Sequence, residues 1–171
     1  MISAMVKRGI RATEAALGEA ADYLRDIYRA SPAALFKFAL FLPFAAHRKS
    51  APKPVLHVAR LVGSLAQDCG PCVQIALNQA RKDDVPAEVL RAVIDERPEC
   101  LPDDLTEAYL FVRAIVDKDP RADELRAALA TRYGDAAIVD LAFGIAAAQV
   151  FPIVKRVMGH GQSCQRYTFE I

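Results

Sequence analysis

The sequence has almost no net charge, since its 171 residues include 22 Lys and Arg residues and 21 Asp and Glu residues. Proteins that bind nucleic acid usually carry a clear basic excess, so we expect no nucleic-acid partner. The first thirty residues carry charged side chains throughout and lack the uninterrupted apolar core of a secretory signal. These absences predict a cytoplasmic protein.

Long hydrophobic runs are also scarce. The most apolar stretch that we identify, residues 33–46, is about fourteen residues long, whereas a membrane-spanning helix needs roughly twenty. Lys37 and Pro43 interrupt this stretch. We interpret it as a buried helix and do not expect membrane contact.

Strand patterns, internal repeats and low-complexity tracts are missing as well. Apolar residues instead recur at intervals of three and four, which is typical of amphipathic helices. The sequence therefore predicts an all-α helical bundle. We expect helices over residues 3–29, 32–46 and 55–67, from the turn at 69–72 to 81, and over 86–94, 104–118, 120–133 and 135–158.

Several helix ends carry recognisable signals. Ser31 followed by proline predicts an N-cap with proline at the first helical position. Asp103 or Asp104, and likewise Asp135, are expected to cap the helices that follow them. Gly134 is expected to end the helix before it.

The domain organisation follows from one polar segment, residues 47–54, which holds two prolines and is typical of a linker. We predict an N-terminal helical extension over residues 1–50, a main helical domain over 54–158 and a C-terminal tail over 159–171. Hydrophobic residues make up 53% of the chain, above the usual range, and much of the excess is alanine. Spare apolar surface of this kind favours a homo-oligomer.

Two of the four cysteines, Cys69 and Cys72, form a CGPC motif. At this spacing on a helical turn, the two sulfurs lie on one side and can approach disulfide distance. Pro71 suits the first turn of a helix, which places Cys69 near the N-cap, where free backbone N–H groups stabilise a thiolate. The pair thus combines a nucleophile with a second thiol that can resolve its sulfenic acid.

Other interpretations of the cysteines stay open. The motif could be half of a zinc site, with His160 and Cys164 as the other half, or a purely structural disulfide. A thioredoxin fold requires a strand before the motif, but the preceding residues have a helical pattern, so we reject it. We find no metal, flavin or haem motif and predict no cofactor.

The chain resembles the superfamily of alkyl hydroperoxidase D and carboxymuconolactone decarboxylase. The similarity is carried by residues 56–64 leading into the Cys69–Cys72 motif, supported by residues 84–86 and 134–141. It covers about residues 54–158. The resemblance implies a helical bundle of the alkyl hydroperoxidase D type that forms homo-oligomers. The decarboxylase branch generally lacks the cysteine pair, so its activity is not implied.

The resemblance also implies roles for individual residues. Cys72 would be the peroxidatic cysteine and Cys69 the resolving one. The family's glutamate and histidine, which relay protons, correspond to His57 and Ala76 here. The chain therefore departs from the family at both relay positions, and we suggest that His57 takes over proton transfer.

The resulting hypothesis is a thiol-dependent enzyme that reduces hydroperoxides through Cys72 and Cys69, with His57 handling protons and a dithiol protein as the reductant. Alternatives are a thiol–disulfide exchange protein without peroxide turnover, a non-enzymatic binding or assembly protein, and a zinc-stabilised domain. Cys100, Cys164 and His160 have no assigned role. Four phenylalanines are interpreted as core or interface, or alternatively as the wall of a hydroperoxide site, namely Phe36, Phe38, Phe41 and Phe44.

Overall fold

Helices provide all the regular structure in the part of the chain that the structure describes. This computed structural model describes residues 2–161 and 168–171, and they contain no strand. The predicted all-α class is therefore confirmed. In chain order the elements are α1 (Ile2–Leu17), α2 (Asp22–Ala30), α3 (Pro32–Ala39), α4 (Phe41–Ala45), α5 (Lys53–Leu65), α6 (Gly70–Lys82), α7 (Ala87–Ile94), the 3-10 turn η1 (Pro98–Cys100), α8 (Asp103–Asp117), α9 (Ala122–Tyr133) and α10 (Asp135–Val157).

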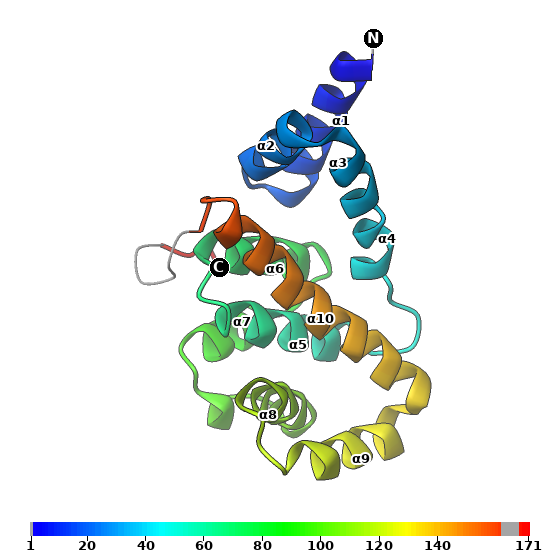
Figure 1. Cartoon of the computed structure of the whole chain (residues 1–171). Helices are drawn as coiled ribbons and strands as arrows, with labels where there is room; N and C mark the ends of the chain where they lie inside the picture. Colours follow the sequence, from blue (N-terminus) through cyan, green and yellow to red (C-terminus); the bar gives the residue numbers. More distant parts are fainter. Residues whose placement is uncertain (1, 162–167) are drawn as a thin grey trace.

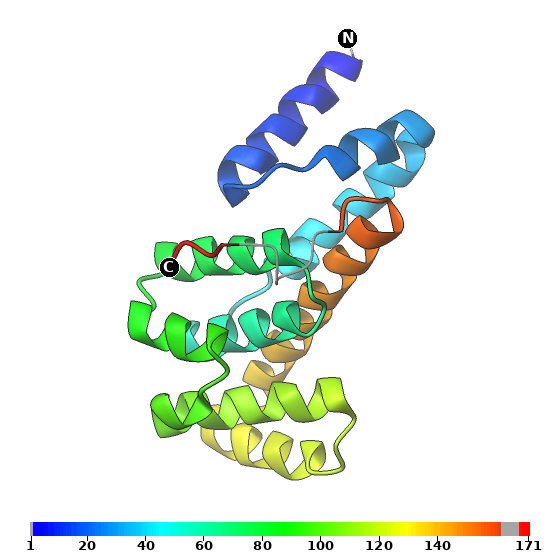
Figure 2. The same cartoon turned by 90° about the vertical axis from the view of Figure 1, so that its left-hand side faces the viewer.

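The elements are arranged in three tiers. Helices α1 to α3 lie at one end of the molecule and α8 with α9 at the other, with α5, α6, α7 and α10 between them (Figure 1 and Figure 2). Helix α5 is central because it packs against α10, α8, α6 and α7. The short helix α4 runs from the N-terminal tier down to α10, which it contacts. This arrangement brings the start of α6 under the N-terminal tier.

The N-terminal helices are more divided than the sequence indicates. The helix expected over 3–29 ends at Leu17, because Gly18 adopts a left-handed conformation with φ of 74°. The helix expected over 32–46 is split at Leu40 into α3 and α4. The start of α3 is as predicted, since Ser31 Oγ accepts a hydrogen bond from the Ala34 backbone N–H at 3.3 Å.

Two predicted aspartate caps are wrong. Pro102 and Gly134 occupy the N-cap positions of α8 and α10, so Asp103, Asp104 and Asp135 lie in the first turns instead. Carboxylates there still interact favourably with the positive end of the helix dipole. Gly134 ends α9 as predicted, with φ of 83°.

The hydrophobic core lies in the middle and lower tiers. Its buried members come from residues 51–145, and residues 1–50 contribute none to it. Phe169 and Ile171, near the end of the chain, pack against the same core. Gln74 holds this end by donating to and accepting from the backbone of Glu170, at 3.0 and 2.9 Å.

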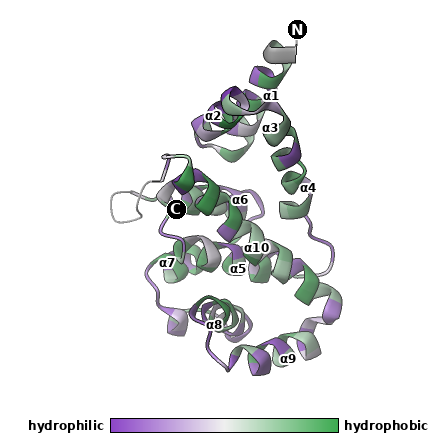
Figure 3. Cartoon of the chain, viewed as in Figure 1, coloured by the Kyte–Doolittle hydropathy of each residue, from purple (hydrophilic) through white to green (hydrophobic). Residues whose placement is uncertain are grey.

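Helix α10 is a longer apolar segment than the stretch at 33–46, which we took as the most apolar. An 18-residue window in it reaches a mean hydropathy of 2.0, which by length and composition is enough to cross a membrane. Figure 3 shows hydrophobic residues along most of this helix. Core helices of globular proteins meet the same criterion, and 39% of this window is buried against the rest of the chain.

Candidate redox site

The two cysteines of the CGPC motif form a disulfide. Their Cα atoms are 5.3 Å apart, within the usual range for such a bond. Cys69 is the N-cap of α6 and Cys72 lies in its first turn, as predicted from Pro71. The backbone N–H groups of Cys72 and Val73 both donate to the Cys69 carbonyl, at 2.9 and 3.0 Å. The motif is therefore fixed by the start of the helix itself.

The turn that leads into the disulfide is held by a cation. Asp68 is exposed and adopts φ of 47°, a left-handed conformation that is uncommon for a residue other than glycine. The Arg156 guanidinium, from the end of α10, donates to the carbonyls of Gln67 and Asp68. Cys69 beneath this turn is 2% exposed and Cys72 is 7% exposed. Both sulfurs are thus shielded from large partners.

His57 lies on α5 with its ring fully buried. Its Nε2 is 2.7 Å from Asp83 Oδ2, and Asp83 also pairs with Arg48 and, at 3.1 Å, with Lys53. The hydrogen bond from Arg48, followed by that from His57, lowers the pKa of Asp83 far below its usual value. Because an ionised carboxylate only accepts hydrogen bonds, Nε2 carries the proton in this pair.

The other nitrogen of His57 is therefore an available base. Nδ1 is buried and has no hydrogen-bond partner. Burial lowers the pKa of His57, and the hydrogen bond with Asp83 opposes this only in part. The ring is accordingly neutral near pH 7, with a free lone pair on Nδ1. Neither ring nitrogen forms a hydrogen bond with Cys72 in this disulfide state.

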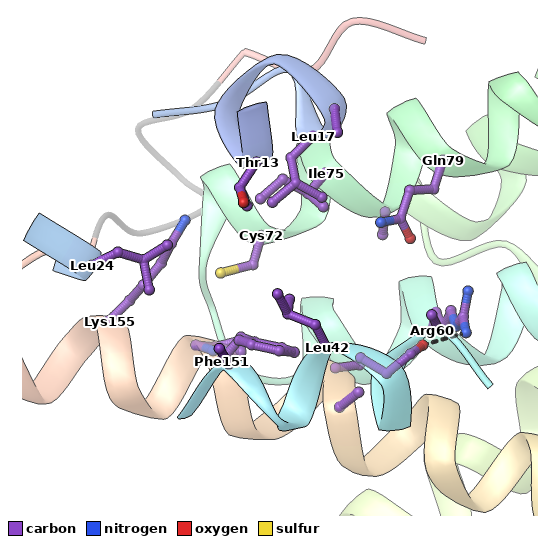
Figure 4. Close-up of a pocket in the computed structure, with 18 of the residues that line it drawn as sticks. Thr13, Leu17, Leu24, Leu42, Arg60, Cys72, Ile75, Gln79, Phe151 and Lys155 are labelled. Atoms are coloured by element: carbon purple, nitrogen blue, oxygen red, sulfur yellow. Dashed lines mark hydrogen bonds between the residues drawn. The ribbon is translucent and has the colours of Figure 1, made fainter. Parts of the chain in front are cut away.

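Cys72 and His57 line one cavity of about 900 Å³ between the N-terminal tier and the middle tier. Its walls come from α1 to α6 and α10, and most of the lining is apolar. Figure 4 shows the Cys72 side chain pointing into this space, with Leu42 and Phe151 on its far side. Cys69 is not among the residues that line it. The two sulfurs are therefore not equivalent, because Cys72 faces the pocket.

The four phenylalanines of the apolar stretch divide between the two interpretations. Phe36 and Phe38 line the pocket, whereas Phe41 and Phe44 do not. Phe44 instead stacks on Phe143 of α10 with ring centroids 4.3 Å apart. This stretch therefore both anchors the N-terminal helices and forms part of the pocket wall.

Cys100 and His160 form no contact with the cysteine pair among the contacts of the described residues. Cys100 is exposed and reduced. His160 Nε2 is 2.7 Å from Asp26 Oδ2, which ties the end of α10 to α2. Cys164 lies outside the described residues, and within them no three His, Cys, Asp or Glu side chains are grouped to hold a metal ion.

Other residues of the site are not recognisable from the sequence. Asp83 follows α6 in a polar segment, and nothing in its neighbourhood indicates that it meets His57. Arg60 reaches the pocket and donates to the Ala45 carbonyl at 2.7 Å. Lys155 also lines the pocket and is 4% exposed. Its one sequence signal is the presence of a lysine within a long apolar helix.

Comparison of the chain with protein-family models, with curated proteins and with solved structures gave no match. The similarity to the alkyl hydroperoxidase D superfamily therefore stays a prediction, and the functional argument rests on the geometry of the disulfide, His57 and the pocket.

Proposed function

We propose that this protein is a thiol-dependent peroxidase that reduces organic hydroperoxides at Cys72. The single observation that carries the proposal is the position of a disulfide-forming cysteine in the wall of a large apolar cavity. A structural disulfide needs no such cavity. An apolar pocket of this size suits a small organic molecule, and it leads that molecule to Cys72 rather than to Cys69.

The chemistry begins with the reduced pair. The Cys72 thiolate attacks the terminal oxygen of the hydroperoxide, so that an S–O bond forms while the O–O bond breaks. The departing alkoxide takes up a proton and leaves as an alcohol. The Cys69 thiol then attacks the Cys72 sulfenic acid, forming the disulfide and releasing water.

Two features of the site support these steps. Cys72 lies in the first turn of α6, where the positive end of the helix dipole favours its thiolate. His57 Nδ1, unpartnered and unprotonated, is the base that takes the thiol proton and returns it to the leaving alkoxide. Because the two residues share the pocket without a direct hydrogen bond, we assign the transfer to an intervening water molecule.

Regeneration requires two electrons, which we assign to a dithiol protein. Its thiolate attacks one sulfur of the pair, and its second thiol completes the exchange, leaving that protein oxidised. Since Cys69 is only 2% exposed, the chain around it has to move before a protein thiol can reach it.

The decisive experiment measures hydroperoxide consumption with single cysteine variants. Cys72→Ser should lose turnover of cumene hydroperoxide, because it lacks the nucleophile. Cys69→Ser should react once and accumulate a sulfenic acid on Cys72 that dimedone traps. Cys100→Ser, which alters an exposed cysteine far from the motif, is the matched control and should behave as the wild type. Full turnover by Cys72→Ser would overturn the proposal.

One observation favours a second candidate, thiol–disulfide exchange without peroxide turnover. His57 does not contact Cys72 directly, so the proton relay is incomplete in this state. In that case the reduced protein would cleave a small disulfide such as bis(2-hydroxyethyl) disulfide while leaving cumene hydroperoxide intact. Measuring both reactions on one preparation separates the two activities.

We also propose a homo-oligomer, which the exposed apolar side chains support. Leu40, between α3 and α4, and Val157 of α10 are 73% and 81% exposed. Such surface is commonly covered by another subunit. Light scattering during size-exclusion chromatography would reveal a single-chain mass if this is wrong.

A further inference from the structure

Lys155 is the least expected side chain of the pocket. It belongs to α10, is 4% exposed and lines the same cavity as Cys72. Its Nζ lies 5.4 Å from the centroid of the Tyr23 ring, in a cation–π contact. The Nζ atom of Lys155 forms no ion pair and no hydrogen bond with another residue in the described part of the chain. Figure 4 shows it on the wall of the pocket beside Leu24.

A buried ammonium group without an anion is costly, because burial removes its hydration. Burial accordingly lowers the pKa of Lys155, and the charge of Glu19 opposes this in part. A cation–π contact offsets part of the lost hydration but supplies no negative charge. The site would therefore gain most from a ligand that brings its own anionic group.

The other charged groups of the pocket are already engaged. Asp83 is the one carboxylate among the described lining residues, and it pairs with Arg48, Lys53 and His57. Arg60 donates to the Ala45 carbonyl, and Lys82 donates to the Ala16 carbonyl at 2.6 Å. The lining thus has an excess of positive charge, and Lys155 is the cation that is left without a hydrogen-bond acceptor in the described residues.

The remainder of the cavity suits a hydrocarbon chain. Leucine, phenylalanine and alanine side chains from the N-terminal helices and α10 make up a large part of its walls. Its volume of about 900 Å³ is near the upper end of the range of about 300–1,000 Å³ typical of small-molecule sites. An apolar tunnel with one buried cation is complementary to an amphipathic molecule with one charged end.

We propose that the pocket binds a fatty carboxylate, whose carboxylate group pairs with Lys155 and whose alkyl chain lies along Leu42, Phe38 and Phe151. This binding needs no redox step and goes beyond the peroxidase function. If the peroxidase function also holds, the natural substrates are hydroperoxides of fatty acids, with the oxidised carbon of the chain near Cys72.

The test is calorimetric titration of the full-length protein with decanoate and with 1-decanol, which has the same chain without the charge. Wild type should bind decanoate more tightly than 1-decanol. Lys155→Met should weaken decanoate binding by about tenfold or more, as expected for the loss of a charge-assisted hydrogen bond. Lys7→Met removes an exposed lysine of α1 and is the matched control, so it should bind decanoate like the wild type.

A second variant guards against an unfolded Lys155→Met. Leu42 is 46% exposed and lines the pocket, so Leu42→Asp should fold and still repel the anionic ligand. Absence of decanoate binding by wild type, or equal binding by Lys155→Met, would overturn the inference.

The redox proposal is separable from this inference because decanoate binding and peroxide turnover are measured independently on the wild-type protein. Peroxide turnover by a wild type that does not bind decanoate would remove the fatty-acid inference and leave the peroxidase. If the wild type binds decanoate but does not turn over peroxide, the peroxidase proposal is removed and the fatty-acid inference stands.

Discussion

The middle and lower tiers of the molecule differ from the N-terminal tier in what they contribute. Buried residues from 51–145 form one continuous hydrophobic core. The disulfide, His57 and Lys155 are on α6, α5 and α10, which all contribute residues to this core. Residues 1–50 contribute nothing to that core, yet they provide roughly half of the pocket wall. The disulfide, His57 and Lys155 are thus placed by one region, whereas the other region forms about half of the wall of the pocket that three of these side chains, Cys72, His57 and Lys155, line.

This division has a physical reason. The N-terminal helices have few buried side chains of their own, among them Ile10, Tyr23 and Leu35. They are attached to the rest of the molecule by side-chain hydrogen bonds instead, such as those from Asn78 and Lys82 of α6 to the carbonyls of Leu17 and Ala16, at 3.0 and 2.6 Å. A region attached in this way can shift without unfolding the core, which suits a cover over a ligand site.

The largest expected effect tests whether the two regions differ in stability. Leu77→Ala removes a fully buried side chain of the core and should lower the free energy of unfolding by about 2–5 kcal/mol. The matched change Leu35→Ala, in the N-terminal tier, should cost clearly less because fewer neighbours surround it. Urea unfolding followed by circular dichroism measures both. Equal losses would mean that the N-terminal helices unfold together with the core.

A buried carboxylate links the two regions and should give the next largest effect. Asp140 Oδ2 accepts the backbone N–H groups of Lys49, Ser50 and Ala51 at 2.9, 2.6 and 2.8 Å, which fixes the segment after α4 onto α10. Asp140→Asn leaves one oxygen but loses the charge, and should cost about 1–3 kcal/mol of unfolding free energy.

The pH dependence of that loss follows from the pKa of Asp140. Burial alone would raise it, but the three backbone donors, with His47, lower it overall. A lowered pKa in the folded state gives stability that is present above the unfolded value of about 3.9 and is lost as pH falls below it. The gap between wild type and Asp140→Asn should therefore narrow in acid. Asp95→Asn, an exposed control, should show no such narrowing.

Local features of the fold were predictable because the signals lie within a few residues. Pro71 predicts where α6 starts and so places Cys69 at the N-cap, and Gly134 marks the boundary between α9 and α10. The break at Gly18 was missed because apolar spacing continues on both sides of it. The aspartate caps failed because a proline and a glycine already occupy the cap positions.

The site could be predicted only in part, since its parts meet through packing. The CGPC spacing by itself identifies the two cysteines that form the disulfide. His57 was found through its offset from Cys69, but its partner Asp83 lies 26 residues further along the chain. The spacing of apolar residues does not predict that Lys155 lies in the pocket, because a long aliphatic stem allows lysine to fit an apolar helix face. No local sequence pattern shows which helix faces will meet to line a pocket.

A smaller effect is expected at the turn before the disulfide. Arg156 holds the carbonyls of Gln67 and Asp68, so Arg156→Met should let this turn open more often. Reduction of the disulfide by a water-soluble phosphine should then be about threefold to tenfold faster, as expected for the loss of one such interaction. Thiol alkylation at timed intervals measures the rate.

The control for this experiment is Arg132→Met, which removes an exposed ion pair with Glu107 remote from the motif. An unchanged rate in Arg156→Met would indicate that reductants reach the sulfurs through the pocket. The N-terminal tier would then limit reduction as well as substrate entry.

The smallest expected effect concerns the pH profile of peroxide turnover, and it depends on the proposed role of His57. Burial keeps the pKa of His57 below its usual value of about 6.5, and Asp83 raises it in part. If Nδ1 is the base, kcat/KM should fall as pH drops through this lowered pKa. Asp83→Asn keeps an oxygen for Nε2–H but removes the charge that raises the pKa of His57, so the acid limb should move to still lower pH. A limb that stays in place would show that the base lies elsewhere, and Asp95→Asn provides the matched comparison because its exposed carboxylate pairs with Arg97 instead.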